Sequence, residues 1–512
     1  ISNSYTGGTV VEDGILLTTS DSLPGDVVNN AAVVFEQTTD GTWSGAMTGT
    51  GALVKNGTGT LTLTGSNSYS GGTLVAGGTL RATTSSLQGV VVNDARVVLD
   101  QSFDGTFNGA MTGSGVFEKA GSGTVTLEAP LVHTGGTIIS GGRLVGTGAT
   151  LRGRLQSEAV VTFGGAGSYL FDGTLSGSGA FEKIGTGILG LRGAHDHTGL
   201  FSITQGIVDL DGTLASRVVV GPGGALRARG TLTGPLTING GILFVPAPDQ
   251  APASASAKTT QAAPRNTFDA PLLTITGNLT MNPGSQLFLP VAQGTTPALA
   301  ITGSGLFDGA TIDITPTGPL TERTTSFLAL SADGGLEMQN TVGTSADPLL
   351  RMILRQDENR LFVTMVNLGI PFEDEVTNPN ARSVGGILDR LKQNPTGEWE
   401  NIFEQVAGLS DSELEQALRQ ISGEAHATFT QVGFTDSEMA NDVVREQIFR
   451  RRRDSRLGSN LGASWWANGG GQRTTLKDGG RRIGTIDLGS TMAGMDYRPS
   501  GSVTFGLGGG LA

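Results

Sequence analysis

The stretch Gly49–Leu80, GTGALVKNGTGTLTLTGSNSYSGGTLVAGGTL, decides the fold because it recurs along the chain at a constant spacing. Gly113–Leu144 reads GSGVFEKAGSGTVTLEAPLVHTGGTIISGGRL, and Gly177–Val208 reads GSGAFEKIGTGILGLRGAHDHTGLFSITQGIV. The spacing is 64 residues each time (113 − 49 = 64, 177 − 113 = 64), and the second half of the unit also opens the chain, as NSYTGGTVVEDGIL from Asn3. A fixed period indicates stacked units, each of which buries its apolar face against the next.

Each unit has the pattern of short strands joined by turns. Apolar residues alternate with Thr, Val or other residues in pairs such as Leu61/Leu63 and Val33/Phe35, which is the period of a β-strand. Pairs such as Gly71-Gly72 separate these runs and favour turns with positive φ. The predicted fold class is therefore all-β, a right-handed parallel β-helix (solenoid) with three turns of roughly 20 residues in each unit.

The string GTGTLTLTGSNSYSGGTLVAGGTL, which ends at Leu80, resembles the passenger-associated repeat of bacterial autotransporters (type V secretion). The pattern recurs four times in whole or in part. The resemblance implies a secreted β-helical passenger, a short α-helical connector and an outer-membrane β-barrel. The chain is then expected to be a fragment that is truncated early in the translocator barrel.

Composition supports a secreted, repetitive rod. The chain has 512 residues, of which 81 are Gly, and it has no Cys and a net charge of −13. The negative charge argues against general nucleic-acid binding. The chain contains no run of 18 apolar residues, so no membrane helix is predicted. The chain begins inside a repeat and shows no signal peptide, so we expect it to be a segment of a longer precursor.

Shifts in composition predict five regions. Residues 1–245 form the β-helix with 64-residue repeats, and residues 246–268 form a Pro/Ala/Ser-rich loop or linker, interpreted as a tolerated insertion or a binding loop. Residues 269–368 form the last β-helix turns, which by resemblance act as an autochaperone. Residues 369–458 form a helical connector and barrel plug, and residues 459–512 form the start of an incomplete barrel.

The connector region predicts several helices. Ser383–Gln393 has its apolar residues on one helical face, Glu400–Leu409 is a second short helix, and Ser410-x-x-Glu413 is a capping box. Met439–Arg453 is the candidate plug helix. The basic run at its end, Arg450–Arg453, has three interpretations: a plug in an acidic barrel lumen, a protease site, or a nucleic-acid contact.

Strand patterns return near the end of the chain, at Leu461–Asn468, Thr485–Tyr497 and Ser502–Leu511. Aromatic residues lie near the ends of these stretches, as they do in the strands of membrane barrels.

The motif search predicts no catalytic, cofactor-binding or metal site. Gly185–Gly190 matches G-x-G-x-x-G, but the same glycines recur in the other units, so the match is interpreted as a repeat turn. His195 and His197 could suggest a metal site. However, His197 and His133 align with Tyr69, and the preferred interpretation is a hydrogen-bonded surface His at a turn.

Lysines recur in register at Lys55, Lys119 and Lys183. We interpret them as a solvated edge of the rod. A row of charge that binds polysaccharide or matrix is the alternative.

These observations predict an autotransporter whose outer-membrane translocator exports and anchors a surface-exposed passenger, for adhesion or self-association. The alternatives are a stalk for a distal effector and a β-helical enzyme that acts on polysaccharide. The chain is expected not to be an enzyme and to need no cofactor. Expected partners are outer-membrane lipid, the barrel-assembly machinery and a host-surface or self-association ligand, but no nucleic acid. The expected location is the outer membrane of a Gram-negative bacterium, with the passenger on the cell surface.

Overall fold

The computed structural model describes residues 3–248, 250, 267–320, 322, 324–345, 350–367, 370–391, 406, 409, 411–422, 462–478, 481–500 and 503–511. The chain divides into two compact units, residues 1–370 and residues 371–512. Each unit is described by itself.

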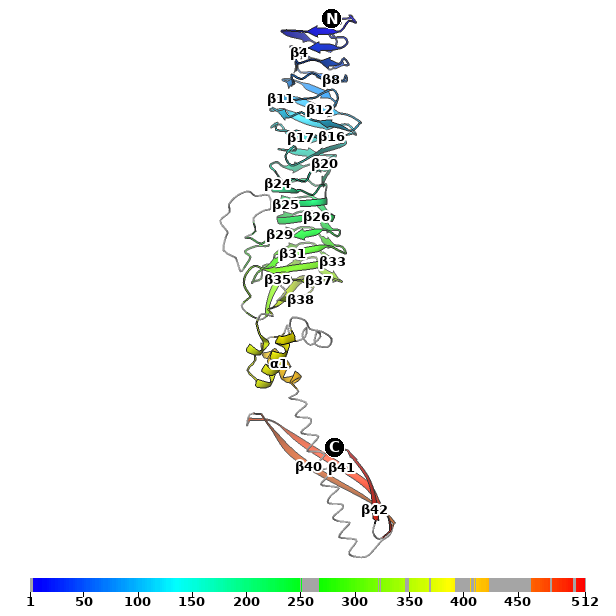
Figure 1. The fold of residues 1–512 in the computed structure, drawn as a ribbon, viewed down its shortest axis with the longest axis vertical. Helices are drawn as coiled ribbons and strands as arrows, with labels where there is room; N and C mark the ends of the chain where they lie inside the picture. The colour runs from blue at the N-terminus through cyan, green and yellow to red at the C-terminus, as the bar shows by residue number, and fades with distance from the viewer. Residues whose placement is uncertain are drawn as a thin grey trace. The chain divides into compact units, whose positions relative to one another are not determined.

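The first unit is a parallel β-solenoid of stacked turns (Figure 1), and the strands of one turn belong to different sheets. A single turn illustrates this arrangement: β11 (Val91–Asn93) joins a six-stranded sheet, β12 (Arg96–Asp100) an eight-stranded sheet, and β13 (Gly105–Phe107) a 22-stranded sheet. The parallel β-helix predicted from the repeats is thus confirmed, and its handedness stays a prediction.

The strands before residue 180 are short. Those of the three-stranded and six-stranded sheets are β1 (Thr9–Val11), β3 (Val27–Asn29), β6 (Met47–Thr48), β2 (Ile15–Thr18), β4 (Ala32–Glu36), β7 (Ala52–Asn56), β9 (Thr73–Val75), β11 and β14 (Met111–Thr112). The eight-stranded sheet consists of β5 (Gly41–Trp43), β8 (Thr60–Leu63), β10 (Thr79–Ala82), β12, β15 (Val116–Ala120), β17 (Thr137–Ile139), β19 (Leu155–Ser157) and β22 (Leu175–Ser176).

The 22-stranded sheet continues to the end of the unit. Its strands after β13 are β16 (Thr124–Leu127), β18 (Arg143–Gly146), β20 (Val160–Phe163), β21 (Tyr169–Phe171), β23 (Ala180–Lys183), β24 (Ile188–His195), β25 (Leu200–Leu214), β26 (Arg217–Leu232), β27 (Leu236–Ile238), β28 (Ile242–Phe244), β29 (Leu273–Ile275), β30 (Leu279–Met281), β31 (Gln286–Val291), β32 (Leu299–Ile301), β33 (Gly305–Asp308), β34 (Thr311–Pro316), β35 (Thr324–Ala332), β36 (Leu336–Gln339), β37 (Val342–Thr344), β38 (Leu350–Gln356) and β39 (Arg360–Asn367).

The interior is filled by the residues that alternate inward along each strand. In β8, Leu61 and Leu63 are buried, whereas Thr60 and Thr62, which alternate with them, are half-buried on the outer side. Phe163, Phe181 and Phe201 lie on neighbouring turns and their rings stack, with centroids 6.2 Å apart in each pair. Because a buried aromatic ring contributes more apolar area than any aliphatic side chain, this stack holds three turns in register.

The 64-residue period does not equal three whole turns. Starting at Leu16, the six-stranded sheet places Val33, Leu53 and Thr73 in register on the next three turns. Leu80, which lies 64 residues after Leu16, instead enters the neighbouring eight-stranded sheet. Equivalent residues of successive units therefore lie on successive sheets, and each unit is rotated by one face relative to the last.

The last turns of the first unit change their hydrogen-bonding pattern. β39 pairs antiparallel with both β35 and β38, whereas the other strand pairs described in this unit are parallel. Because β39 lies between β35 and β38, its backbone N–H and C=O groups are paired on both sides at this end of the solenoid.

The second unit contains helices and a separate sheet. Its helices are a 3-10 turn η1 (Phe372–Asp374), α1 (Pro379–Leu391) and α3 (Asp411–Ile421). Three antiparallel strands follow, β40 (Gly462–Asp478), β41 (Arg481–Ser500) and β42 (Val503–Leu511), in the places where three strands were predicted. β40 and β41 are longer than predicted.

Two details of the connector differ from the sequence-based expectation. α1 begins at Pro379, four residues earlier than predicted, because the Asn378 side chain accepts hydrogen bonds from the backbone N–H groups of Asn380 and Ala381. The sequence alone indicates an acidic, solvated linker just before α1, but Phe372 in that stretch is fully buried and its N–H donates to Asp389. The predicted helix Glu400–Leu409 lies largely outside the described residues.

The aromatic stack gives a first prediction. Phe181→Ala removes the middle ring and leaves a cavity between two turns, so we expect the free energy of unfolding to fall by about 3–5 kcal/mol. Urea titration followed by far-UV circular dichroism measures it. Phe103→Ala, at a Phe that is 48% exposed, is the matched control and should change stability by less than about 0.5 kcal/mol. Equal losses in both variants would contradict the stacking role.

Candidate functional site

The ammonium group of Lys119 lies inside the solenoid and is held by three backbone carbonyl groups. Nζ donates to the oxygens of Ala120 at 2.5 Å, Gly121 at 2.9 Å and Gly141 at 3.1 Å. The side chain is 0% exposed. Because an ammonium group has three protons, the three carbonyls satisfy it completely.

The other two repeated lysines make the same contacts. Lys55 donates to Asn56 at 2.7 Å, Gly57 at 2.9 Å and Gly77 at 2.9 Å. Lys183 donates to Ile184 at 2.9 Å, Gly185 at 2.5 Å and Gln205 at 3.2 Å. We call each such arrangement a lysine cage: one buried Lys and the three carbonyl groups that bind its Nζ.

A glycine closes each cage. Gly78 has a φ of +65°, and a Cβ at this position would lie 2.8 Å from the Nζ of Lys55 and 2.5 Å from the carbonyl oxygen of Gly57. Gly142 and Gly206 occupy the same place beside Lys119 and Lys183. A side chain at these positions would displace the ammonium group, so the Gly after each cage is required by space as well as by its dihedral angle.

Burial lowers the pKa of the Lys119 ammonium, and the carboxylates of Asp100 and Asp104 act in the opposite direction. The interpretation of these lysines as a solvated edge is therefore wrong. A charged row that binds polysaccharide is also excluded, because Lys55, Lys119 and Lys183 lie in three different sheets and are buried in all of them. Sequence register alone could not distinguish an inward Lys from an outward one.

The repeated histidines are also buried. His133, His195 and His197 are at most 7% exposed, so the prediction of surface His is wrong. The predicted equivalence with Tyr69 is confirmed for His133: the hydroxyl of Tyr69 lies 2.6 Å from Oγ1 of Thr73, and Nε2 of His133 lies 3.3 Å from Oγ1 of Thr137. No group of three potential metal ligands occurs among the described residues.

One histidine contacts a serine, which calls for comparison with hydrolytic sites. Nδ1 of His197 lies 2.7 Å from Oγ of Ser216, and its Nε2 lies 2.8 Å from the carbonyl oxygen of Gly179. Both side chains are fully buried. A nucleophile must reach its substrate, so this pair is a structural hydrogen bond and no catalytic dyad.

The G-x-G-x-x-G match at residues 185–190 lies in the turn between β23 and β24 and in β24 itself. Its Gly185 has a φ of +75° and its carbonyl oxygen binds Lys183. No helix follows the match, so the interpretation as a repeat turn is confirmed. The plug helix Met439–Arg453, with its basic run, lies outside the described residues.

The outer side of the six-stranded sheet carries an apolar row. It consists of one outward residue from each of five consecutive strands, and these residues are in register: Leu17, Val34, Val54, Leu74 and Val92. Leu17 is 64% and Val92 is 37% exposed, and the other three are half-buried. The row therefore leaves apolar surface partly exposed along one side of the solenoid, which makes it a candidate contact surface.

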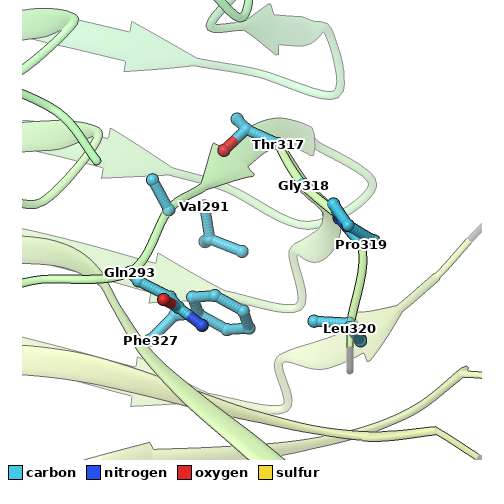
Figure 2. Close-up of a pocket in the computed structure, with 8 residues that line it drawn as sticks. Val291, Gln293, Thr317, Gly318, Pro319, Leu320 and Phe327 are labelled. Atoms are coloured by element: carbon cyan, nitrogen blue, oxygen red, sulfur yellow. The ribbon is translucent and has the colours of Figure 1, made fainter. Parts of the chain in front are cut away.

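A small hollow lies at a corner near the end of the solenoid. Figure 2 shows the ring of Phe327 facing the segment Thr317–Leu320, with Val291 between them. The hollow has a volume of about 20 Å³. This volume holds about one water molecule, so the hollow is no ligand site.

Comparisons with known proteins fit this geometry. The passenger-associated transport repeat family matches residues 2–17, 53–82, 117–145 and 181–210. The chain is 34% identical over 144 residues to the protein named "Adhesin BmaC autotransporter" of Brucella suis biovar 1 (strain 1330). It is 21% identical over 325 residues to the protein named "Extracellular serine protease" of Serratia marcescens.

The chain carries an autotransporter passenger. The matches cover 23% of this chain and 4% of the adhesin, and 54% of this chain and 29% of the protease. The chain thus spans only a part of the length of these relatives. Among the residues that the structure describes, no helix is both long and apolar enough to cross a membrane.

The repeats of the passenger coincide with the lysine cages. The three longer matches begin at residues 53, 117 and 181, each two residues before a caged Lys. The caged Lys and the Gly residues around it are thus part of the repeat pattern itself. Their recurrence therefore needs no explanation by a function at the surface.

The lysine cage gives a second prediction. Lys119→Met keeps the length and packing of the side chain but leaves three carbonyl groups without a donor, so we expect the passenger to lose about 3 kcal/mol or more of stability. Urea titration measures the loss. Arg81→Met removes a half-exposed cation that pairs with Asp100 on the surface, and should cost at most about 1 kcal/mol. A Lys119→Met variant as stable as the wild-type protein would contradict the cage.

The buried histidines give a third prediction. Burial lowers the pKa of His133, His195 and His197, so in the unfolded chain these groups bind protons at a higher pH than they do in the folded passenger. The stability they contribute is therefore present above pH ~6.5 and is lost as the pH falls below that value.

We expect the free energy of unfolding to fall between pH ~7 and pH ~5, and His133→Tyr, which copies Tyr69, to make this fall smaller. Denaturation at several pH values tests this expectation. An unchanged pH dependence in His133→Tyr would show that His133 does not contribute.

Proposed function

We propose that this passenger is displayed on the surface of a Gram-negative bacterium and acts as an adhesive rod that associates laterally with a second copy of itself. The apolar row from Leu17 to Val92 carries this proposal, because it presents five in-register apolar side chains along one side of the rod. The matched relative named as an adhesin supports an adhesive role.

A second copy is the partner that the row itself favours. A straight row can pair with the same row of another rod around a two-fold axis, so that one surface serves both partners. The chain has a net charge of −13, so two rods repel each other at low ionic strength. Salt screens this repulsion but not the apolar contact, and association should therefore strengthen as salt is added.

The remaining regions have proposed roles in export. Residues 269–368, which end in the antiparallel strands β38 and β39, would form the stable autochaperone segment. Residues 369–458 would connect the passenger to a translocator, and residues 459–512, with β40, β41 and β42, would begin its barrel in the outer membrane. Outer-membrane lipid and the barrel-assembly machinery would be the partners of that translocator.

Catalysis is the competing function, because one matched relative is named as a protease. We propose binding instead, since the recurring basic groups of the passenger, the caged lysines and the repeated histidines, are enclosed in its core. Cleavage of casein or of a polysaccharide by the purified chain would contradict this. A purely structural stalk is the other alternative, and a loss of self-association in the row variant argues against it.

Lateral association gives a fourth prediction. Replacement of both exposed ends of the row, Leu17→Asp with Val92→Asp, places charges in the apolar contact and should leave the chain monomeric. The control, Thr42→Asp with Thr106→Asp, adds the same charge at exposed positions of other sheets and should associate like the wild-type chain.

Sedimentation velocity at low and high NaCl concentration measures both variants. A wild-type chain that stays monomeric at every salt concentration would contradict the proposal. The same result for both variants would show that the row is not the contact.

A further inference from the structure

A second surface feature lies farther along the solenoid, where an outward row of the 22-stranded sheet contains two phenylalanines. Arg227, Phe244, Phe288 and Asp313 are in register on β26, β28, β31 and β34. Their neighbours along the strands belong to the core, whereas these four side chains lie on the outer side and are half-buried. The two rings are therefore surface groups and not part of the interior packing.

The rings form a platform with a cation beside it. The centroids of Phe244 and Phe288 are 5.9 Å apart, and the guanidinium carbon of Arg227 lies 5.8 Å from the centroid of Phe244. Nη1 of Arg227 also lies 2.9 Å from a carboxylate oxygen of Asp209. The charge of Arg227 is thus compensated by Asp209, and the carboxylate of Asp313 at the other end of the row accepts a hydrogen bond from the hydroxyl of Thr344.

A hollow of about 170 Å³ opens on this platform. Phe244, Phe288 and Pro290 give it apolar walls, and Gln250, Thr315 and Thr317 give it amide and hydroxyl groups. Nη2 of Arg229 donates to the carbonyl oxygens of Ala247 at 2.6 Å and Gln250 at 3.1 Å. The hollow therefore combines apolar walls with uncharged polar groups.

The lining selects the chemistry of a ligand. An aromatic face attracts the polarised C–H groups of a ring, and amide and hydroxyl groups exchange hydrogen bonds with alcohols. The lining residues described here carry no charged side chain, which disfavours phosphate or sulfate as the ligand. A pyranose ring combines an apolar C–H face with a rim of hydroxyl groups and carries no charge.

We propose that the Phe244–Phe288 hollow binds an uncharged pyranose unit of a glycan, with the ring stacked on Phe288 and its hydroxyl groups bonded to Thr315 and Gln250. This site is separate from the apolar row, and it does not depend on lateral association. It would give the rod a means to contact glycans that is distinct from its contact with other rods.

Isothermal titration calorimetry of the 512-residue chain with maltotriose and with N,N′,N″-triacetylchitotriose, both uncharged, tests the site. We expect at least one of these sugars to bind. Phe288→Ala should weaken the binding roughly tenfold, which corresponds to the loss of one stacking contact. Phe103→Ala, at an exposed Phe outside the hollow, should bind like the wild-type chain.

A second variant guards against a folding defect in Phe288→Ala. Thr315→Trp changes an exposed residue and fills the hollow, so it should abolish binding while the far-UV circular dichroism spectrum stays unchanged. Binding that survives in Thr315→Trp, or a wild-type chain that binds neither sugar, would overturn the proposal. Sedimentation of the same samples reports on lateral association independently.

Discussion

The structure depends on backbone hydrogen bonds that run from each turn of the solenoid to the next. Strands of only three to five residues cannot be stable alone, and they persist here because each is paired on both sides along most of the stack. At the turns between strands, the hydrogen bonds between neighbouring strands are interrupted and some backbone carbonyl groups point into the solenoid. The caged lysines satisfy three of these groups each, so a buried cation takes over where strand pairing ends.

This constraint also explains the composition of the repeat. The caged Lys and the Gly that closes the cage recur in all three cages, whereas the residues that supply the carbonyl groups vary, because any residue has a backbone carbonyl. The outer positions are free of this requirement. Function can therefore vary on the surface, as in the apolar row at Leu17 and the aromatic hollow at Phe288, while the interior pattern stays the same.

The sequence was sufficient for the fold class and for the strands, because alternation and Gly pairs report directly on a β-strand and its turns. It also predicted that His133 and Tyr69 are equivalent. It could not predict that Lys119 points inward, since a Lys that follows Glu118 in an alternating strand has the same pattern whether it is solvated or caged. Nor could the period show that each unit is rotated by one sheet, because that depends on turn lengths that only the pairing register reveals. The apolar row was missed for the same reason.

The register of the turns is the central claim, and engineered disulfides test it most directly because the chain has no Cys. Leu74 and Val92 are neighbours in register on β9 and β11, at the spacing that a disulfide requires. The account predicts that Leu74→Cys with Val92→Cys forms a bond on mild oxidation, and that Leu74→Cys with Ala95→Cys does not. If each 64-residue unit made three equal turns, Ala95 would lie in register with Leu74, and the second pair would form instead. That result would contradict the rotation of the repeats.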